Sequence, residues 1–162
     1  MNQNDIQIRA AGEGDLEALT QISKNGAGYF KRCMEEQRTV LFAALAGKNA
    51  GYGILNWNPR YNLYRKFSIP EIQDLNVLPE ARKKGVATAM IAYCEKQAAA
   101  KGCETIGISV GLHSGFGAAQ RLYVKLGYVP DGFGVTYDRQ PVTAGELRPI
   151  DDDLCLMMVK VL

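Results

Sequence analysis

Three basic residues and a glycine stand where a strand pattern gives way to a long helical pattern. The run Arg82-Lys83-Lys84-Gly85 directly precedes an apolar helical periodicity that begins at Val86. The first amides of a helix have no partner within it, and the helix dipole is positive at that end. A pyrophosphate fits such a place, and a glycine lets the backbone approach it closely. The segment predicts an anion-binding turn, and a plain strand-to-helix turn with solvated charges is the alternative.

Other chemical motifs are missing from the sequence. No Gly-Lys pair is followed by Ser or Thr, and the pairs Gly26/Gly28, Gly51/Gly53 and Gly132/Gly134, which start a G-x-G-x-x-G pattern, are followed by Lys31, Asn56 and Tyr137 in place of the third glycine. Nucleotide hydrolysis and hydride transfer are therefore disfavoured. A serine or cysteine hydrolase would have to use His113, the one histidine, and no G-x-S-x-G elbow accompanies it.

Cysteine spacing and charge exclude further classes. The four cysteines form no C-x-x-C pair, so we expect free thiols, no metal site and no redox dithiol. A net charge of +2 gives no support for nucleic-acid binding. The N-terminal residues lack an apolar signal-peptide core, and no run of 18 apolar residues exists, so a cytoplasmic protein without membrane contact is expected.

The elements that must position these residues follow from apolar periodicity. The 162 residues suffice for a single domain, 1–162, with its own core. Tight turns make the early strands antiparallel, and the β-α-β unit over 71–110 requires a parallel pair. The fold class is therefore α/β, an α+β mixed sheet that is mostly antiparallel with a central parallel β-α-β pair and helices on both faces. Strands are expected at 6–10, 39–46, 50–56, 71–78, 105–110 and 154–162 and from 128, helices at 16–22, 29–37, 86–97 and 119–126, and long loops at 58–70 and 133–153.

Two stretches of the sequence resemble motifs of the GNAT superfamily of acyl-CoA N-acyltransferases. IQDLNVLPEARKKGVATAMI is similar to the strand, turn and helix of motif A, and AAQRLYVKLGYVP is similar to the later helix and strand. The opening IQIRAAGEGDLEAL and the order of elements agree as well, so the resemblance covers nearly the whole chain and implies a GNAT-like fold. The family often has an asparagine before the later helix, where this chain has Ser114 or Phe116.

The resemblance implies a cofactor, acetyl-CoA, with CoA as product and no metal. The strand residues Leu75, Asn76 and Val77 would hydrogen-bond the pantetheine arm, on a strand that is often irregular in this family. Tyr123 would lie near the sulfur and protonate the leaving thiolate, and its alternative is a core aromatic residue. The pyrophosphate site implied by the resemblance comprises Arg82, Lys83, Lys84, Gly85, Val86, Ala87 and Thr88.

A general base is needed because an alkyl ammonium with a pKa near 10.4 is mostly protonated at pH 7. Glu71 matches the catalytic glutamate of the histone acetyltransferase branch, and a strand-end carboxylate is its alternative. Asp74 lies on the same strand, and alternation places it on the opposite face from Glu71. His113 and a chain of water molecules are the other candidates, so the identity of the base stays open.

The function implied by the resemblance is transfer of an acetyl group from acetyl-CoA to a primary amine, by direct attack in a ternary complex. A small-molecule amine is the expected acceptor. The alternatives are a protein lysine or N-terminal acetyltransferase and a non-catalytic acyl-CoA-binding module. The acidic run Asp151-Asp152-Asp153 favours a cationic acceptor, whereas the arginines and tyrosines of the 58–70 loop favour an acidic or aromatic one. The acyl chain length and the oligomeric state stay open, with a homodimer as one alternative.

Overall fold

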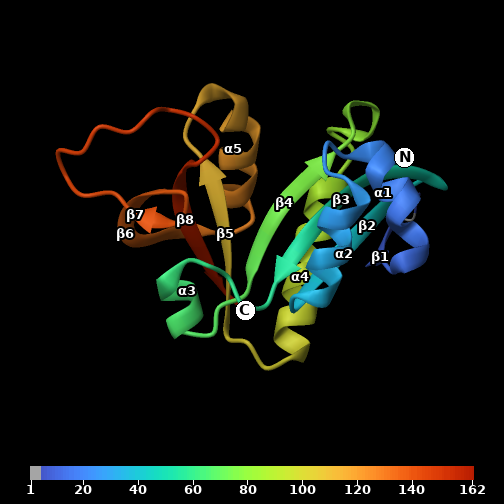
Figure 1. The fold of residues 1–162 in the computed structure, drawn as a ribbon, viewed down its shortest axis with the longest axis horizontal. Helices are drawn as coiled ribbons and strands as arrows, with labels where there is room; N and C mark the ends of the chain where they lie inside the picture. Colours follow the sequence, from blue (N-terminus) through green and yellow to red (C-terminus); the bar gives the residue numbers. More distant parts are fainter. Residues whose placement is uncertain (1–4) are drawn as a thin grey trace. The chain divides into compact units, whose positions relative to one another are not determined.

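The computed structural model describes residues 5–162 and forms a mixed sheet (Figure 1). The strand order is β1-β2-β3-β4-β5-β8-β6-β7, mostly antiparallel with β4 and β5 parallel, so the predicted fold class is confirmed. The strands are β1 (Ile6–Ala10), β2 (Arg38–Leu45), β3 (Lys48–Asn56), β4 (Glu71–Val77), β5 (Thr105–Gly111), β6 (Val129–Tyr137), β7 (Gln140–Pro141) and β8 (Leu154–Val161). The helices are α1 (Leu16–Ile22), α2 (Ala27–Glu35), α3 (Asn62–Lys66), α4 (Val86–Ala100) and α5 (Gly117–Lys125), with short 3₁₀ turns at Glu13–Asp15, Pro79–Ala81 and Ser114–Phe116.

The chain divides into two compact units, which are described separately. Unit 1 contains the described residues up to Asn58 together with Ile72–Gln97, and unit 2 contains Pro59–Glu71 and Ala98–Leu162. In unit 1, β2 and β3 form a hairpin whose two turn residues, Ala46 and Gly47, both have positive φ. This is the turn geometry that matches the twist of paired strands.

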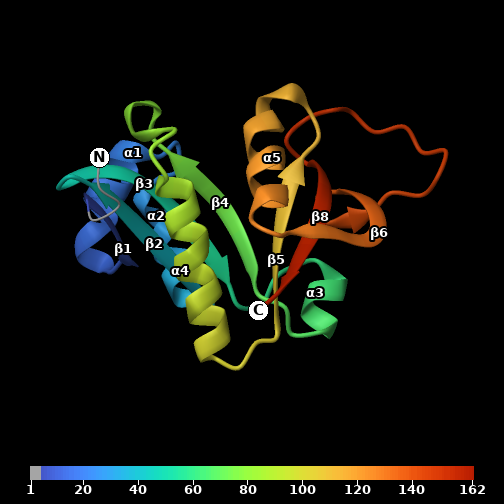
Figure 2. The ribbon, with the colours of Figure 1, turned by 180° about the vertical axis from the view of Figure 1, so that it is seen from behind.

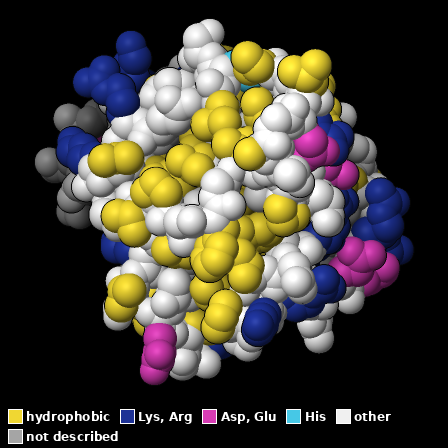
Figure 3. Space-filling view, turned by 90° about the vertical axis from the view of Figure 1, so that its left-hand side faces the viewer, with side chains coloured by type: hydrophobic (Ala, Val, Ile, Leu, Met, Phe, Trp, Pro, Cys, Tyr) yellow, Lys and Arg dark blue, Asp and Glu magenta, His cyan; other side chains and the backbone are white. Residues whose placement is uncertain are grey.

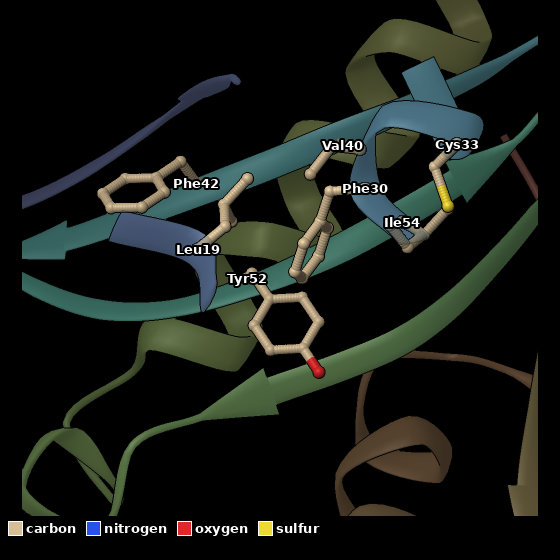
Figure 4. Packing of buried hydrophobic residues seen from close by; sticks show 7 residues of the cluster. All are labelled: Leu19, Phe30, Cys33, Val40, Phe42, Tyr52 and Ile54. Atoms are coloured by element: carbon tan, nitrogen blue, oxygen red, sulfur yellow. The ribbon is translucent and has the colours of Figure 1, made fainter. Parts of the chain in front are cut away.

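Helices cover both faces of the sheet in unit 1. In Figure 1 α1 and α2 lie in front of β2 and β3, and the reverse view in Figure 2 brings α4 to the front. The first face buries Phe30 and Cys33 of α2 against Tyr52 and Ile54 of β3, as Figure 4 shows. The second face buries Val86 and Met90 of α4 with alanines of the hairpin. Burying these apolar side chains, at about 1.5–3 kcal/mol for each large one, fixes both helices on the strands.

Tyrosines form the core of unit 2. Tyr61 and Tyr64 pack edge-to-face with ring centroids 4.8 Å apart and lie in one cluster with Met157 of β8. The Tyr64 ring lies so close to Gly107 of β5 that a Cβ there would be 2.4 Å from it. Glycine at this position therefore makes room for the aromatic side chain.

Two segments differ from the expected long loops. Residues 62–66 form α3 within the 58–70 loop, because the buried Tyr61 and Tyr64 fix that segment on the core. Most of 133–153 is loop, as expected, but its first part belongs to strands, since β6 continues to Tyr137 and β7 follows. The register of β6 on β8 shifts between Pro130 and Val135, where two glycines have positive φ, and this shift hides the strand alternation in the sequence.

Apolar side chains cover much of the face that Figure 3 shows, and charged side chains of both signs lie mainly toward its margins. Within residues 5–162 no helix combines the length and the hydropathy that crossing a membrane requires. All four cysteines lie in the described part of the chain and are free thiols.

Candidate functional site

The strand assigned to the pantetheine arm closely approaches its neighbour in unit 1. Leu75, Asn76 and Val77 are half-buried. A Cβ added at Gly51 of β3 would lie 2.2 Å from the Asn76 carbonyl oxygen, so only glycine fits opposite this segment. The strand also contains a left-handed residue, Asp74, with φ of 49°, and left-handed residues are typical of β-bulges.

The loop between β4 and α4 is exposed and has a specific backbone conformation. Lys83 and Gly85 have φ of 59° and 88°, so two left-handed residues alternate with ordinary ones before the helix begins. The Gly85 carbonyl oxygen accepts the first helical bond, from the Ala89 amide at 2.9 Å. In Figure 2 this loop lies at the upper end of α4, where β4 ends. The backbone thus presents the start of a 15-residue helix to solvent.

Two of the loop's basic side chains stabilise the loop itself. The Arg82 Nε donates to the Val77 carbonyl oxygen at 3.0 Å, and the Lys84 Nζ donates to the Glu80 carbonyl oxygen at 2.8 Å. Both cations remain exposed, so their charge stays at the loop surface. A loop that fixes its own shape and places positive charge at a helix N-terminus suits a pyrophosphate.

Tyr123 lies in unit 2 on α5 and is 7% exposed. Its ring centroid is 6.3 Å from that of Tyr128, and burial raises the pKa of Tyr123 to about 12. The hydroxyl therefore keeps its proton at neutral pH and can act as a donor. The surroundings agree with both expectations for this residue, a buried aromatic and a proton donor.

Glu71, the expected base, is fully buried in unit 2 and belongs to an ion pair. Its Oε1 accepts a hydrogen bond from Nη2 of Arg139 at 2.8 Å, and the same Nη2 lies 3.2 Å from Oγ of Ser109. Arg139 occupies the turn between β6 and β7 and has φ of 62°. The guanidinium stabilises the carboxylate as an anion, so the pair anchors this turn to the first residue of β4.

Replacing Glu71 by glutamine is expected to lower the free energy of unfolding by about 2 kcal/mol. The variant keeps the shape of the side chain but removes the charge that Arg139 contacts. The loss stays below the 3–5 kcal/mol typical of a broken buried pair, because the Arg139 side chain is 22% exposed and can be partly hydrated. Urea unfolding measures the change. Glu104→Gln, at an exposed glutamate of the same unit, is the control, and equal stabilities of the two variants would contradict the anchoring role.

His113 is engaged at both ring nitrogens. Nδ1 accepts the Gly115 amide at 3.0 Å, and Nε2 lies 2.7 Å from Oδ1 of Asp152. A neutral ring in this arrangement carries its proton on Nε2 and donates it to the carboxylate. The contact with Gly115 caps the turn that follows β5, and the contact with Asp152 holds the loop before β8 against this turn. Both ring nitrogens are therefore occupied, and neither is open as a base.

Two partners of the candidate residues could not be found by reading the chain locally. Arg139 lies 68 residues after Glu71, and Tyr29, whose hydroxyl donates to Asp74, lies 45 residues before it. Neither belongs to a motif. Asp138 and Arg139 close a two-residue hairpin turn with positive φ, but this pair is not one of the glycine-containing pairs that predict such a turn from sequence.

The described residues contain no group of three or more histidine, cysteine, aspartate or glutamate side chains that could hold a metal ion. The comparisons with known proteins agree with the geometry. The Acetyltransferase (GNAT) family model matches residues 10–128, and the chain belongs to this family. No curated protein matches the sequence.

Solved structures of the same fold share little sequence identity with this chain. A ribosomal-protein-alanine N-acetyltransferase from Brucella melitensis has a TM-score of 0.70 at 19% identity, covering 96% of this chain and 99% of its own. Spermidine/spermine N-acetyltransferase SpeG from Vibrio cholerae has 0.68 at 17%, covering 98% and 93%. A GNAT acetyltransferase from Elizabethkingia anophelis with acetyl-CoA bound has 0.70 at 15%, covering 99% and 100%. At these identities the likeness concerns the fold.

Proposed function

We propose that this protein transfers an acetyl group from acetyl-CoA to the primary amine of a small molecule. The observation that carries the proposal is the loop from Arg82 to Gly85, which places exposed cations and left-handed backbone at the start of α4. Family membership supports acetyl transfer, and a relative of the same fold has acetyl-CoA bound. The titles of other relatives name spermidine and a ribosomal protein, so a protein amine is the alternative acceptor.

Different segments of the chain would bind the pyrophosphate and the pantetheine arm of acetyl-CoA. The amides from Lys84 to Thr88 would hold the pyrophosphate, with Arg82, Lys83 and Lys84 adding charge. The backbone of Leu75–Val77 would pair with the pantetheine arm. Acetyl-CoA supplies the thioester: the amine nitrogen forms a bond to its carbonyl carbon, the bond from that carbon to sulfur breaks with its electron pair leaving on the CoA thiolate, and the proton lost by the amine passes to the general base. Holding both substrates together supplies much of the acceleration.

Tyr123 would stabilise the leaving sulfur. A thiol has a pKa near 8.5, and burial raises the pKa of Tyr123 to about 12. Full transfer of the proton from tyrosine to thiolate is uphill by the difference between these values, about 5 kcal/mol. We therefore propose that the Tyr123 hydroxyl donates a hydrogen bond to the thiolate. The hydroxyl keeps its proton, and the hydrogen bond stabilises the negative charge on sulfur. The role of Glu71 as the base stays a prediction, and kcat of Glu71→Gln, measured below its melting temperature, tests it.

Acetyl-CoA is expected to raise the melting temperature by roughly 5–10 °C at 100 times its dissociation constant. Such a concentration adds about 2.7 kcal/mol to the stability of the folded state, and each kcal/mol shifts a domain of this size by 2–4 °C. Differential scanning fluorimetry measures the shift, and free CoA as the product should give one as well. No shift at millimolar acetyl-CoA would contradict the proposal. A shift without transfer to any small or peptide amine would identify a non-catalytic binding module.

A further inference from the structure

Asp74 has an unusual backbone for its place in the fold. Seven non-glycine residues of the described chain have positive φ, and six of them lie in turns or connections between elements. Asp74 is the one within a strand, β4, and its side chain is exposed. A strained non-glycine residue persists only where its surroundings hold it, and such residues cluster at functional sites.

A hydroxyl group holds the Asp74 carboxylate from one side. The Tyr29 hydroxyl of α2 donates a hydrogen bond to Oδ2 of Asp74. Partial burial and the nearby carboxylate raise the pKa of Tyr29 above its ordinary value, so the hydroxyl keeps its proton and acts as the donor. A neutral donor orients the carboxylate without cancelling its charge.

Aromatic packing fixes the position of Tyr29. The next residue, Phe30, is fully buried, and its ring centroid lies 5.2 Å from that of Tyr29 and 5.3 Å from that of Tyr52. Figure 4 shows the Phe30 ring beside the Tyr52 ring, with Cys33 and Ile54 alongside. The hydroxyl of Tyr52 in turn receives a hydrogen bond from Ser23 at 3.0 Å. The core of unit 1 thus sets where the Tyr29 hydroxyl lies.

We propose that Asp74, oriented by Tyr29, binds an ammonium group of the acceptor other than the amine that is acetylated, so that the enzyme selects cationic amines. The inference rests on the proposed function, because Asp74 directly precedes the segment Leu75–Val77 that we assign to the pantetheine arm. An exposed carboxylate with one oxygen oriented by a neutral donor matches an ammonium group, which offers three donors and a positive charge. Asp74 is a binding residue here and takes no part in bond making.

Asp74→Asn is the decisive variant, because asparagine tolerates a left-handed backbone and can still accept the Tyr29 hydrogen bond. Lysinamide and 1,4-diaminobutane serve as cationic probes and glutamate as the acidic one, with thiol release as the measure of transfer. We expect the variant to raise KM for the cationic probes roughly 10–100-fold while KM for acetyl-CoA stays within twofold. Tyr29→Phe should raise the same KM by about three- to tenfold.

Glu17→Gln is the control, since Glu17 is also an exposed carboxylate of unit 1, in the first turn of α1. Its kinetics should equal those of the unchanged protein. If the role of Asp74 is purely structural, asparagine can replace it without changing the kinetics. Unchanged KM values in Asp74→Asn would therefore overturn the inference. Faster transfer to glutamate than to either cationic probe would also overturn it. The same holds if the protein binds acetyl-CoA but transfers no acetyl group to lysinamide or 1,4-diaminobutane. Failure of the unchanged protein to bind acetyl-CoA would instead overturn the proposed function.

Discussion

Replacing Tyr123 by phenylalanine is expected to lower kcat roughly 10²- to 10³-fold, the usual range for removing one hydrogen-bond donor that stabilises charge developing in the transition state. The variant removes one hydroxyl from a side chain that is 7% exposed, so packing on α5 is preserved. Affinity for acetyl-CoA should stay the same, because the proposed hydrogen bond forms as negative charge develops on the sulfur. Steady-state thiol release gives kcat, and the acetyl-CoA-induced melting shift gives the affinity.

Tyr128→Phe is the control for this variant. The Tyr128 ring is buried and lies 6.3 Å from that of Tyr123, so the substitution also removes a hydroxyl beside the same core. Its kcat should stay within a few-fold of the unchanged protein, even if the melting temperature falls. An unchanged kcat in Tyr123→Phe would mean that Tyr123 is a packing residue and that the thiolate leaves without its help.

The parts of the site that sequence could predict are those encoded within a few neighbouring residues. The helix that begins at Val86 follows from local periodicity and is found where expected, and the structure adds that the glycine before it, Gly85, has a positive φ. The apolar alternation of 105–110 and the helical spacing of 119–126 likewise identify β5 and α5 to within two residues. Local rules suffice here because the strand and the helix each bury a regular stripe of side chains.

The remaining features depend on contacts between distant residues. The alternation rule separates Glu71 and Asp74 but does not indicate that one is buried with Arg139 and the other held by Tyr29. The strand expected from residue 128 is not followed as far as Tyr137, because positive φ at Gly132 and Gly134 interrupts the period of two. Tertiary packing decides such cases, and a single sequence has no local signal for it.

The two carboxylates of β4 therefore have different electrostatic surroundings. Glu71 is buried and paired with a guanidinium, so its charge is largely neutralised within unit 2. Asp74 is exposed and its oriented partner is a neutral hydroxyl, so its charge is available to a ligand. Within residues 5–162 Asp74 takes part in no ion pair, and an incoming cation gains most beside such a carboxylate, so we propose Asp74 rather than Glu71 for recognising the amine.

Replacing Gly85 by glutamate is expected to weaken acetyl-CoA binding by more than 100-fold. The new carboxylate would stand beside the amides that we assign to the pyrophosphate. Two like charges about 5 Å apart repel by about 3 kcal/mol at an effective dielectric constant near 20, which corresponds to a factor of more than a hundred. Isothermal titration calorimetry with acetyl-CoA measures the loss directly and does not depend on the acceptor.

Gly85→Ala separates this charge effect from strain in the backbone. With φ of 88°, any side chain at residue 85 is strained, but a Cβ there would come no closer than 3.7 Å to its neighbour, Ile6. Alanine should therefore cost about 1 kcal/mol of stability and reduce affinity less than tenfold, whereas glutamate adds repulsion to the same strain. Equal affinities of the two variants would show that charge at this loop is irrelevant, and the phosphates of acetyl-CoA would then have to bind elsewhere on the chain.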